Sequence, residues 1–180
     1  HRRNNCTKKI AEKISSLFHD GDCIMLDASS TALLLLNYIK NLKNITLITN
    51  SVEALIELSD KDDWNVFSTG GKLKRGSLSL VGPSAEKTIR TFHVDYAVCS
   101  SKGIDIERGI TDSNEKDSEM KQAIFDSAET KILVVDSSKF NRISLIKVCD
   151  VGNVDVIATD TQPEANWVEY LKSKNIDLIY

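Results

Sequence analysis

Short apolar runs alternate with helix-like stretches along the whole chain. Residues 23–26 read Cys-Ile-Met-Leu, and an apolar run of this length is typical of a strand buried on both faces of a parallel sheet. The leucine-rich stretch at 31–38 predicts a helix, and a second strand is predicted at 45–49. Strands that alternate with helices are joined by right-handed crossovers in a parallel sheet. The pattern therefore predicts an α/β fold, with a mainly parallel βαβ sheet flanked by helices.

The same alternation continues to the end of the chain. We predict further strands at residues 64–68, 77–81, 94–99, 131–135, 145–149, 154–158 and 176–179. We predict further helices at residues 7–19, 52–58, 83–90, 116–128 and 163–172. In such sheets the ligand binds beyond the carboxyl ends of the strands. The polar loops after the first three strands, residues 27–31, 49–51 and 69–72, are therefore expected to converge at one edge of the sheet.

The turn from Asp27 to Thr31 joins the first of these strands to its helix. Backbone N–H groups at a helix start have no partner inside the helix, and the helix dipole favours an anion there. The hydroxyls of Ser29, Ser30 and Thr31 beside these donors would suit a phosphate. The alternative is that Ser29 or Ser30 only caps the helix. At this point the sequence leaves both interpretations open.

Composition narrows the class of protein. The chain has 180 residues, 41% of them hydrophobic, which is enough for the core of one sizeable domain. Its formal net charge of −3 argues against a nucleic-acid surface on this chain, because such surfaces are usually basic. The four cysteines form no C-x-x-C pair, and we interpret them as reduced thiols of a cytoplasmic protein. No apolar run is long enough to span a bilayer, so we expect no membrane partner.

Short motifs of polar residues and glycines follow one another along the chain. They are Leu26-Asp27-Ala28-Ser29-Ser30-Thr31, Thr49-Asn50-Ser51, Gly70-Gly71, Val81-Gly82-Pro83, Gly103-Ile104-Asp105, Gly109-Ile110-Thr111-Asp112, the helix with Glu119 and Lys121, and Asp136-Ser137-Ser138-Lys139-Phe140. In this order they resemble the effector-sensing domain of DeoR-type bacterial transcriptional repressors. The resemblance extends from about Cys6 to Ile179, almost the whole chain.

This resemblance implies a fold similar to that of ribose-5-phosphate isomerase and the CoA transferases. It implies a phosphorylated sugar as the effector, neither cofactor nor metal, and a homo-oligomer. It also implies a missing amino-terminal winged helix-turn-helix, through which alone the protein would bind DNA. The chain begins at His1 without methionine, and we expect residues 1–5 to be the remnant of a linker and residues 6–180 to be the effector-sensing domain.

The candidate effector-binding residues come from these motifs. They are Asp27, Ser29, Ser30, Thr31, Asn50, Gly70, Gly71, Lys102, Gly103, Asp105, Lys121 and Lys139. A carboxylate accepts two sugar hydroxyls, which assigns that role to Asp27 and Asp105, although Asp105 could instead order its turn. The Gly70-Gly71 pair would admit backbone close to a ligand, or would form a plain tight turn.

The lysines owe their assignment mainly to the resemblance. Lys121 on a generic helix would be solvated, but the match to the family makes it an expected anion ligand, and Lys139 after a strand is placed similarly. Many relatives carry an acidic or amide residue just before the glycine that is Gly103 here. This chain has Lys102 at that position, and a cation there changes which sugar is accepted.

Two other functions compete with the sensor. An aldose–ketose sugar-phosphate isomerase could use the same pocket, but it needs a carboxylate base against the carbon-bound proton, and Glu119 is the only candidate. A nucleotide-binding module is disfavoured because the chain has neither G-x-G-x-x-G nor G-x-x-x-x-G-K-[ST]. We therefore expect a sensor without catalytic residues.

Overall fold

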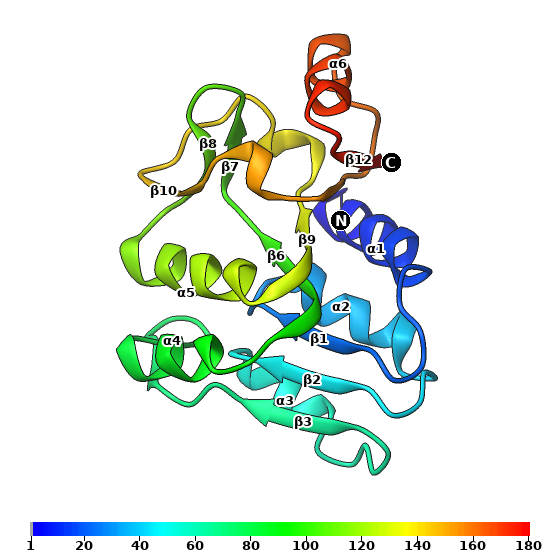
Figure 1. Cartoon of the computed structure of the whole chain (residues 1–180), viewed down its shortest axis with the longest axis vertical. Coiled ribbons are helices and arrows are strands. Elements are labelled where there is room, and N and C mark those ends of the chain that lie inside the picture. The colour runs from blue at the N-terminus through cyan, green and yellow to red at the C-terminus, as the bar shows by residue number, and fades with distance from the viewer. Residues whose placement is uncertain (1) are drawn as a thin grey trace.

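A seven-stranded sheet runs through the molecule in the order β12-β11-β9-β6-β1-β2-β3 (Figure 1). The computed structural model describes residues 2–180 of the chain, with side chains from residue 4 onward. Its strands are Cys23–Leu26 (β1), Thr46–Thr49 (β2), Asn65–Ser68 (β3), Val94–Ser100 (β6), Ala128–Val134 (β9), Val156–Ala158 (β11) and Asp177–Ile179 (β12). All six neighbouring pairs are parallel. The predicted α/β fold with a mainly parallel sheet is confirmed.

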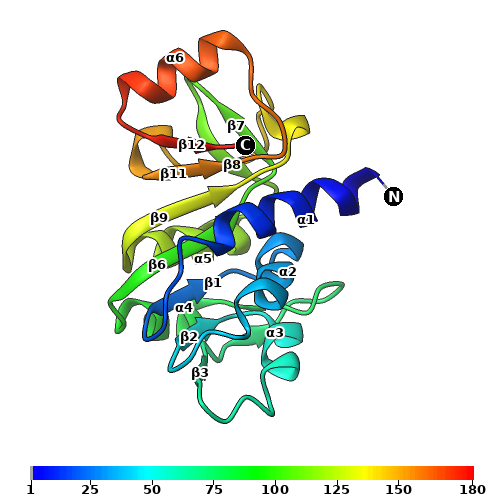
Figure 2. The ribbon, with the colours of Figure 1, turned by 90° about the vertical axis from the view of Figure 1, so that its right-hand side faces the viewer.

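Helices cover both faces of this sheet (Figure 2). Arg2–Ser15 (α1), Ser30–Ile39 (α2) and Val52–Glu57 (α3) lie on one face; Pro83–Arg90 (α4) and Glu115–Asp126 (α5) lie on the other, where Ala165–Ser173 (α6) joins the same layer of the core. Ile24 and Leu26 point into the first layer and Met25 into the second, because side chains alternate along a strand. Two buried faces explain why this strand reads as an unbroken apolar run.

Two small antiparallel units were not predicted as such. Gly103–Asp105 (β7), Gly109–Asp112 (β8) and Ile146–Cys149 (β10) form a three-stranded sheet, and Lys72–Leu73 (β4) pairs with Leu80–Val81 (β5). The sequence predicted no strand where β7 and β8 lie, and a strand from residue 77 where only β5 forms. Two or three residues, as in β4, β5 and β7, are too few to show the alternation of a strand, and β8 includes the polar residues Thr111 and Asp112 among its four.

The first helix begins earlier and ends earlier than the predicted span of 7–19. It covers Arg2–Ser15, so the described part of the expected linker remnant, residues 2–5, lies in its first turns. The remaining residue of that remnant, His1, lies outside the described residues. No helix within residues 2–180 combines the length and the apolar character that crossing a membrane requires.

Two of the candidate glycines serve the packing of the fold. At Gly71, which has a φ of 103°, a Cβ would lie 2.7 Å from Ala85 Cβ and from Val81 O. At Gly103, a Cβ would lie 2.3 Å from the backbone oxygen of Arg142. In both places a neighbouring segment of the chain itself, rather than a ligand, occupies the space that the missing side chain leaves.

We expect Gly103→Ala to lower the free energy of unfolding by about 1–3 kcal/mol, because the new methyl group would overlap a backbone oxygen that cannot rotate away. Urea denaturation midpoints measure this change. The control is Gly152→Ala, where a Cβ meets nothing within 4 Å, and which should change stability by less than about 0.5 kcal/mol. Equal losses in the two variants would contradict the packing role of Gly103.

Candidate functional site

Eight of the twelve predicted site residues gather around the carboxyl ends of β1, β2, β6 and β9. Strand order reverses around β1, since β2 and β3 follow on one side of it and β6 and β9 on the other. A crevice forms at such a switch point, where connections leave toward opposite faces of the sheet. Two hollows open there, with volumes of about 460 Å³ and 310 Å³, and they share a wall made of Ser29, Ser100 and Lys102. We call the first, which reaches helix α5, the α5 hollow, and the second, which reaches helix α1, the α1 hollow.

A buried lysine lies against the wall of the α5 hollow. Lys121 Nζ is 2.9 Å from Asp112 Oδ2 and 3.4 Å from Asp27 Oδ2, and it donates a hydrogen bond to the backbone oxygen of Ser100 at 2.6 Å. Burial opposes the charge of the ammonium group, but the two carboxylates outweigh it and raise the pKa of Lys121 above its usual value. Lys121 thus lines the hollow, but the charge that the sequence assigned to an anion ligand is paired with two carboxylates of the protein itself.

Asp27 is held by backbone as well as by Lys121. Its Oδ1 accepts the N–H of Ser29 at 3.0 Å, and its Oδ2 accepts the N–H of Ser100 at 2.8 Å. These bonds tie the turn after β1 to the end of β6. Both carboxylate oxygens therefore have hydrogen-bond partners in the protein. The structural role of Asp27 is to hold these two loops in position.

Asn50, at the end of β2, carries an unsatisfied acceptor. Its Nδ2 donates to the backbone oxygen of Leu80 at 2.9 Å, which fixes the orientation of the amide. Its Oδ1 is buried and receives no hydrogen bond from residues 2–180. A buried acceptor without a donor costs about 1–3 kcal/mol, and such atoms are uncommon in native structures. A ligand hydroxyl is one donor that could satisfy it.

An ion pair crosses the mouth of the α5 hollow. Lys74, in the β4–β5 hairpin, donates to Asp117 Oδ2 at 2.5 Å, near the start of α5. Partial burial raises the pKa of Asp117, but hydrogen bonds from Lys74 and Asn114 outweigh this and lower it overall. The hairpin is thereby fastened across the hollow to the opposite helix.

The α1 hollow is bordered mainly by polar side chains. It is lined by Ser30 and Thr31 at the start of α2, by Lys139, by Thr7 of α1 and by the carboxylate residue Asp136. Ser29 is the N-cap of α2, because its Oγ accepts the N–H of Ala32 at 3.2 Å. Ser29 therefore does what the capping interpretation predicted, while the next two hydroxylated residues face the hollow.

Four candidates lie outside both hollows. Gly70, Gly71 and Gly103 contribute to neither lining. Asp105 Oδ2 accepts the N–H groups of Glu107 and Arg108, at 3.1 and 2.8 Å, so it orders its turn, which was the alternative reading.

Glu119, the candidate base of an isomerase, is exposed and lines neither hollow. Burial raises the pKa of Glu86 on α4, and the negative charge of Glu119 adds to this rise, which places Glu119 toward α4. The neighbouring position, Met120, lines the α5 hollow with a thioether instead.

Several residues of the site were missed as ligand candidates. Asp112 stands at the end of a motif that the sequence did single out, so its position was a usable signal. Lys74 and Asp117 lie 43 positions apart, and nothing in their sequence context connects them. Ser100 contributes through its backbone, whose role depends on the fold alone.

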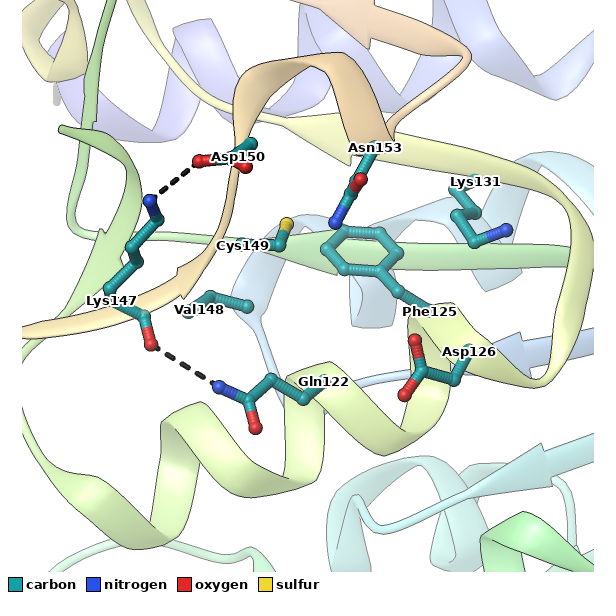
Figure 3. Close-up of a pocket in the computed structure, with 9 residues that line it drawn as sticks. All are labelled: Gln122, Phe125, Asp126, Lys131, Lys147, Val148, Cys149, Asp150 and Asn153. Atoms are coloured by element: carbon teal, nitrogen blue, oxygen red, sulfur yellow. Dashed lines mark hydrogen bonds and ion pairs between the residues drawn. The ribbon is translucent and has the colours of Figure 1, made fainter. Parts of the chain in front are cut away.

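A third hollow, of about 590 Å³, lies away from the predicted residues, between α5 and the segment from β10 to the short 3-10 helix Val151–Asn153 (η2) (Figure 3). Gln122 donates to the backbone oxygen of Lys147, whose side chain pairs with Asp150. Burial, aided by Asp150, raises the pKa of the Cys149 thiol to about 12, so it is protonated at neutral pH. Its lining carries charges of both signs, and its thiol is unreactive. We therefore assign no binding or catalytic role to this hollow.

Comparisons with known proteins find relatives that are named as transcriptional regulators. The HTH-type transcriptional regulator YulB of Bacillus subtilis (strain 168) is 36% identical over 169 residues, which are 94% of this chain and 65% of YulB. The transcriptional repressor GlcR of the same organism is 32% identical over 171 residues, 95% of this chain and 66% of GlcR. The chain thus spans slightly less than two thirds of the length of these relatives.

The fold and the family follow from two further comparisons. Ribose 5-phosphate isomerase A of Methanocaldococcus jannaschii superposes with a TM-score of 0.54 at 17% identity, over 77% of this chain and 55% of the isomerase, which is a likeness of fold alone. The family model for the DeoR C terminal sensor domain matches residues 4–161. Because this match covers most of the sequence, the chain belongs to the family of DeoR C-terminal sensor domains.

Proposed function

We propose that this chain is the effector-sensing domain of a DeoR-type transcription repressor and that its effector is a phosphorylated sugar. The observation that carries the proposal is the pair of adjoining hollows, one built for an anion and one lined by buried acceptors. The relatives named as transcriptional regulators support the regulatory role. In the longer protein, the effector would modulate DNA binding by an amino-terminal helix-turn-helix within a homo-oligomer.

The phosphate binds in the α1 hollow. Backbone N–H groups at the start of α2 lack acceptors within the helix, and the helix dipole adds positive potential there. The hydroxyls of Ser30 and Thr31 and the ammonium group of Lys139 line the same hollow. Charge-assisted hydrogen bonds from such donors to a phosphate are about twice as strong as neutral ones.

The sugar extends past the shared wall into the α5 hollow. There Asn50 Oδ1 lacks a donor, and Asp112 presents a buried carboxylate beside Lys121. The hydroxyl groups of a sugar can donate hydrogen bonds to these acceptors. Because Asn50 Oδ1 is closed to solvent, the sugar reaches it through a local shift of the wall.

The arrangement of carboxylates favours a sensor over an isomerase. An isomerase base must be free to take a proton from carbon. Asp27 and Asp112 are bound to Lys121 and to backbone N–H groups, and Asp117 is bound to Lys74. Glu119, the base that the sequence offered, lines neither hollow.

Sugar phosphates should stabilise the domain, whereas the parent sugars should do so hardly at all, because the α1 hollow supplies anion donors. At a hundred times its Kd, a ligand adds about 2.7 kcal/mol to the free energy of unfolding. A thermal-shift panel of hexose and pentose phosphates, each paired with its free sugar, measures this. Equal shifts from both members of every pair would contradict the phosphate site.

Asn50→Ala should weaken binding of the stabilising sugar phosphate by about twofold to tenfold, which corresponds to the loss of one hydrogen bond. Inorganic phosphate, which occupies the α1 hollow alone, should bind both proteins equally, and it shows that the variant is folded. Titration calorimetry provides both affinities. The control is Asn65→Ala, at an exposed position in β3, which should leave both unchanged. An unaltered sugar-phosphate affinity in Asn50→Ala would remove this residue from the site.

Lys121→Met should lower the free energy of unfolding by about 3–5 kcal/mol, because it leaves two buried carboxylates without their cation. The matched control on the same helix is Lys116→Met, an exposed position, where the change should stay within about 0.5 kcal/mol. Urea denaturation at neutral pH compares the two variants. If Lys121→Met weakened ligand binding without lowering stability, the lysine would serve the ligand alone.

A further inference from the structure

Helix α1 forms part of the wall of the α1 hollow. Thr7, on its second turn, is buried and lines the hollow opposite the start of α2 and near Lys139. Lys139 ends the short 3-10 helix Ser137–Lys139 (η1) that follows β9. A ligand in the α1 hollow therefore lies between α1 and η1.

A second connection joins the same two elements behind the hollow. Asp160, which follows β11, has a carboxylate that accepts the N–H of Ser137 at 2.6 Å and a hydrogen bond from the thiol of Cys6. Its backbone oxygen accepts a hydrogen bond from Lys9 Nζ at 2.5 Å. Asp160 thus connects two residues of α1 to the first residue of η1.

The carboxylate at this junction is charged at neutral pH. Burial raises the pKa of Asp160, but the hydrogen bonds from Cys6 and Ser137 outweigh burial and lower it overall. Hydrogen bonds to a charged group are stronger than those between neutral groups. If η1 moves, the hydrogen bonds of Asp160 resist the movement and transmit it to α1.

The beginning of α1 depends on these polar contacts more than the rest of the helix does. The apolar residues that anchor α1 in the core start at Ile10 and continue with Ala11 and Ile14. Asn4 and Asn5 are exposed, and the first turns extend beyond the body of the domain (Figure 2). The end of α1 that is least anchored by apolar contacts is the end that borders the hollow.

We propose that α1 is a ligand-contacting element and that the link through Asp160 carries occupancy of the α1 hollow to its first turns. An anion held by Lys139 and the start of α2 fixes η1, and Asp160 then fixes residues 6–9 of α1. The inference rests on the proposed anion site. A ligand shifts an equilibrium only through a difference in its contacts between two states, and here the difference lies in how firmly α1 is held.

Hydrogen exchange measured by mass spectrometry, with and without inorganic phosphate or glucose 6-phosphate, tests the link. The informative amides are those of residues 6–9, because this part of α1 contacts Asp160 and the hollow and precedes the first apolar anchor, Ile10. Bound phosphate should slow their exchange together with that of residues 136–139. Slowing at 136–139 without any change in α1 would overturn this inference and leave the anion site standing. If neither probe bound, both the site and the inference would fail.

The double variant Cys6→Ala/Lys9→Met removes the α1 side of the junction and leaves Asp160, η1 and the residues lining the hollow in place. Phosphate should still slow exchange at residues 136–139, and the slowing at residues 6–9 should be lost. The matched control is Lys8→Met, at an exposed position of the same helix, which should behave as wild type. If the double variant kept the full response of α1, the link through Asp160 would be disproved.

Discussion

The ammonium group of Lys121 holds the functional edge of the domain together. It joins α5 to the end of β1 through Asp27, to the end of β8 through Asp112, and to the end of β6 through Ser100. β8 belongs to a different sheet from β1 and β6, and no apolar contact can substitute for this link, because carboxylates buried without a cation are costly. The shape of the α5 hollow and of the wall at Ser100 therefore depends on one largely buried charge.

This constraint also bears on what the site can do. A group that moves protons needs a pKa near the working pH and freedom to change its charge. Here the carboxylates of Asp27 and Asp112 pair with Lys121 and accept backbone N–H groups, so these groups keep their charge. A rigid polar frame that leaves an acceptor such as Asn50 Oδ1 unsatisfied can recognise a ligand without transforming it. The fold shared with ribose 5-phosphate isomerase is thus compatible with binding alone.

The sequence predicted best those features that one stretch of chain determines. A strand buried on both faces must be apolar throughout, so β1 was evident in Cys23–Leu26, and the capping role of Ser29 follows from local chemistry. Contacts between distant segments could not be predicted from the sequence. Arg142 leaves no space for a Cβ at Gly103, and Lys74 contacts Asp117 only in the folded chain. Asp105 was assigned to the ligand, but its carboxylate orders its own turn. The sequence could not separate these two roles, because an aspartate suits both.

The shared wall between the hollows gives Lys102 a particular importance. Its backbone N–H donates to Thr111 O at 3.0 Å, which holds it at the start of the small antiparallel sheet, while its side chain is exposed and lines both hollows. Its position therefore lets the ammonium group approach a ligand in either hollow. An acidic or amide side chain at this position would accept hydroxyl hydrogens rather than attract an anion. Under the proposed function, Lys102 would act where the two hollows meet, so a substitution there should alter the preferred sugar without moving the anion site.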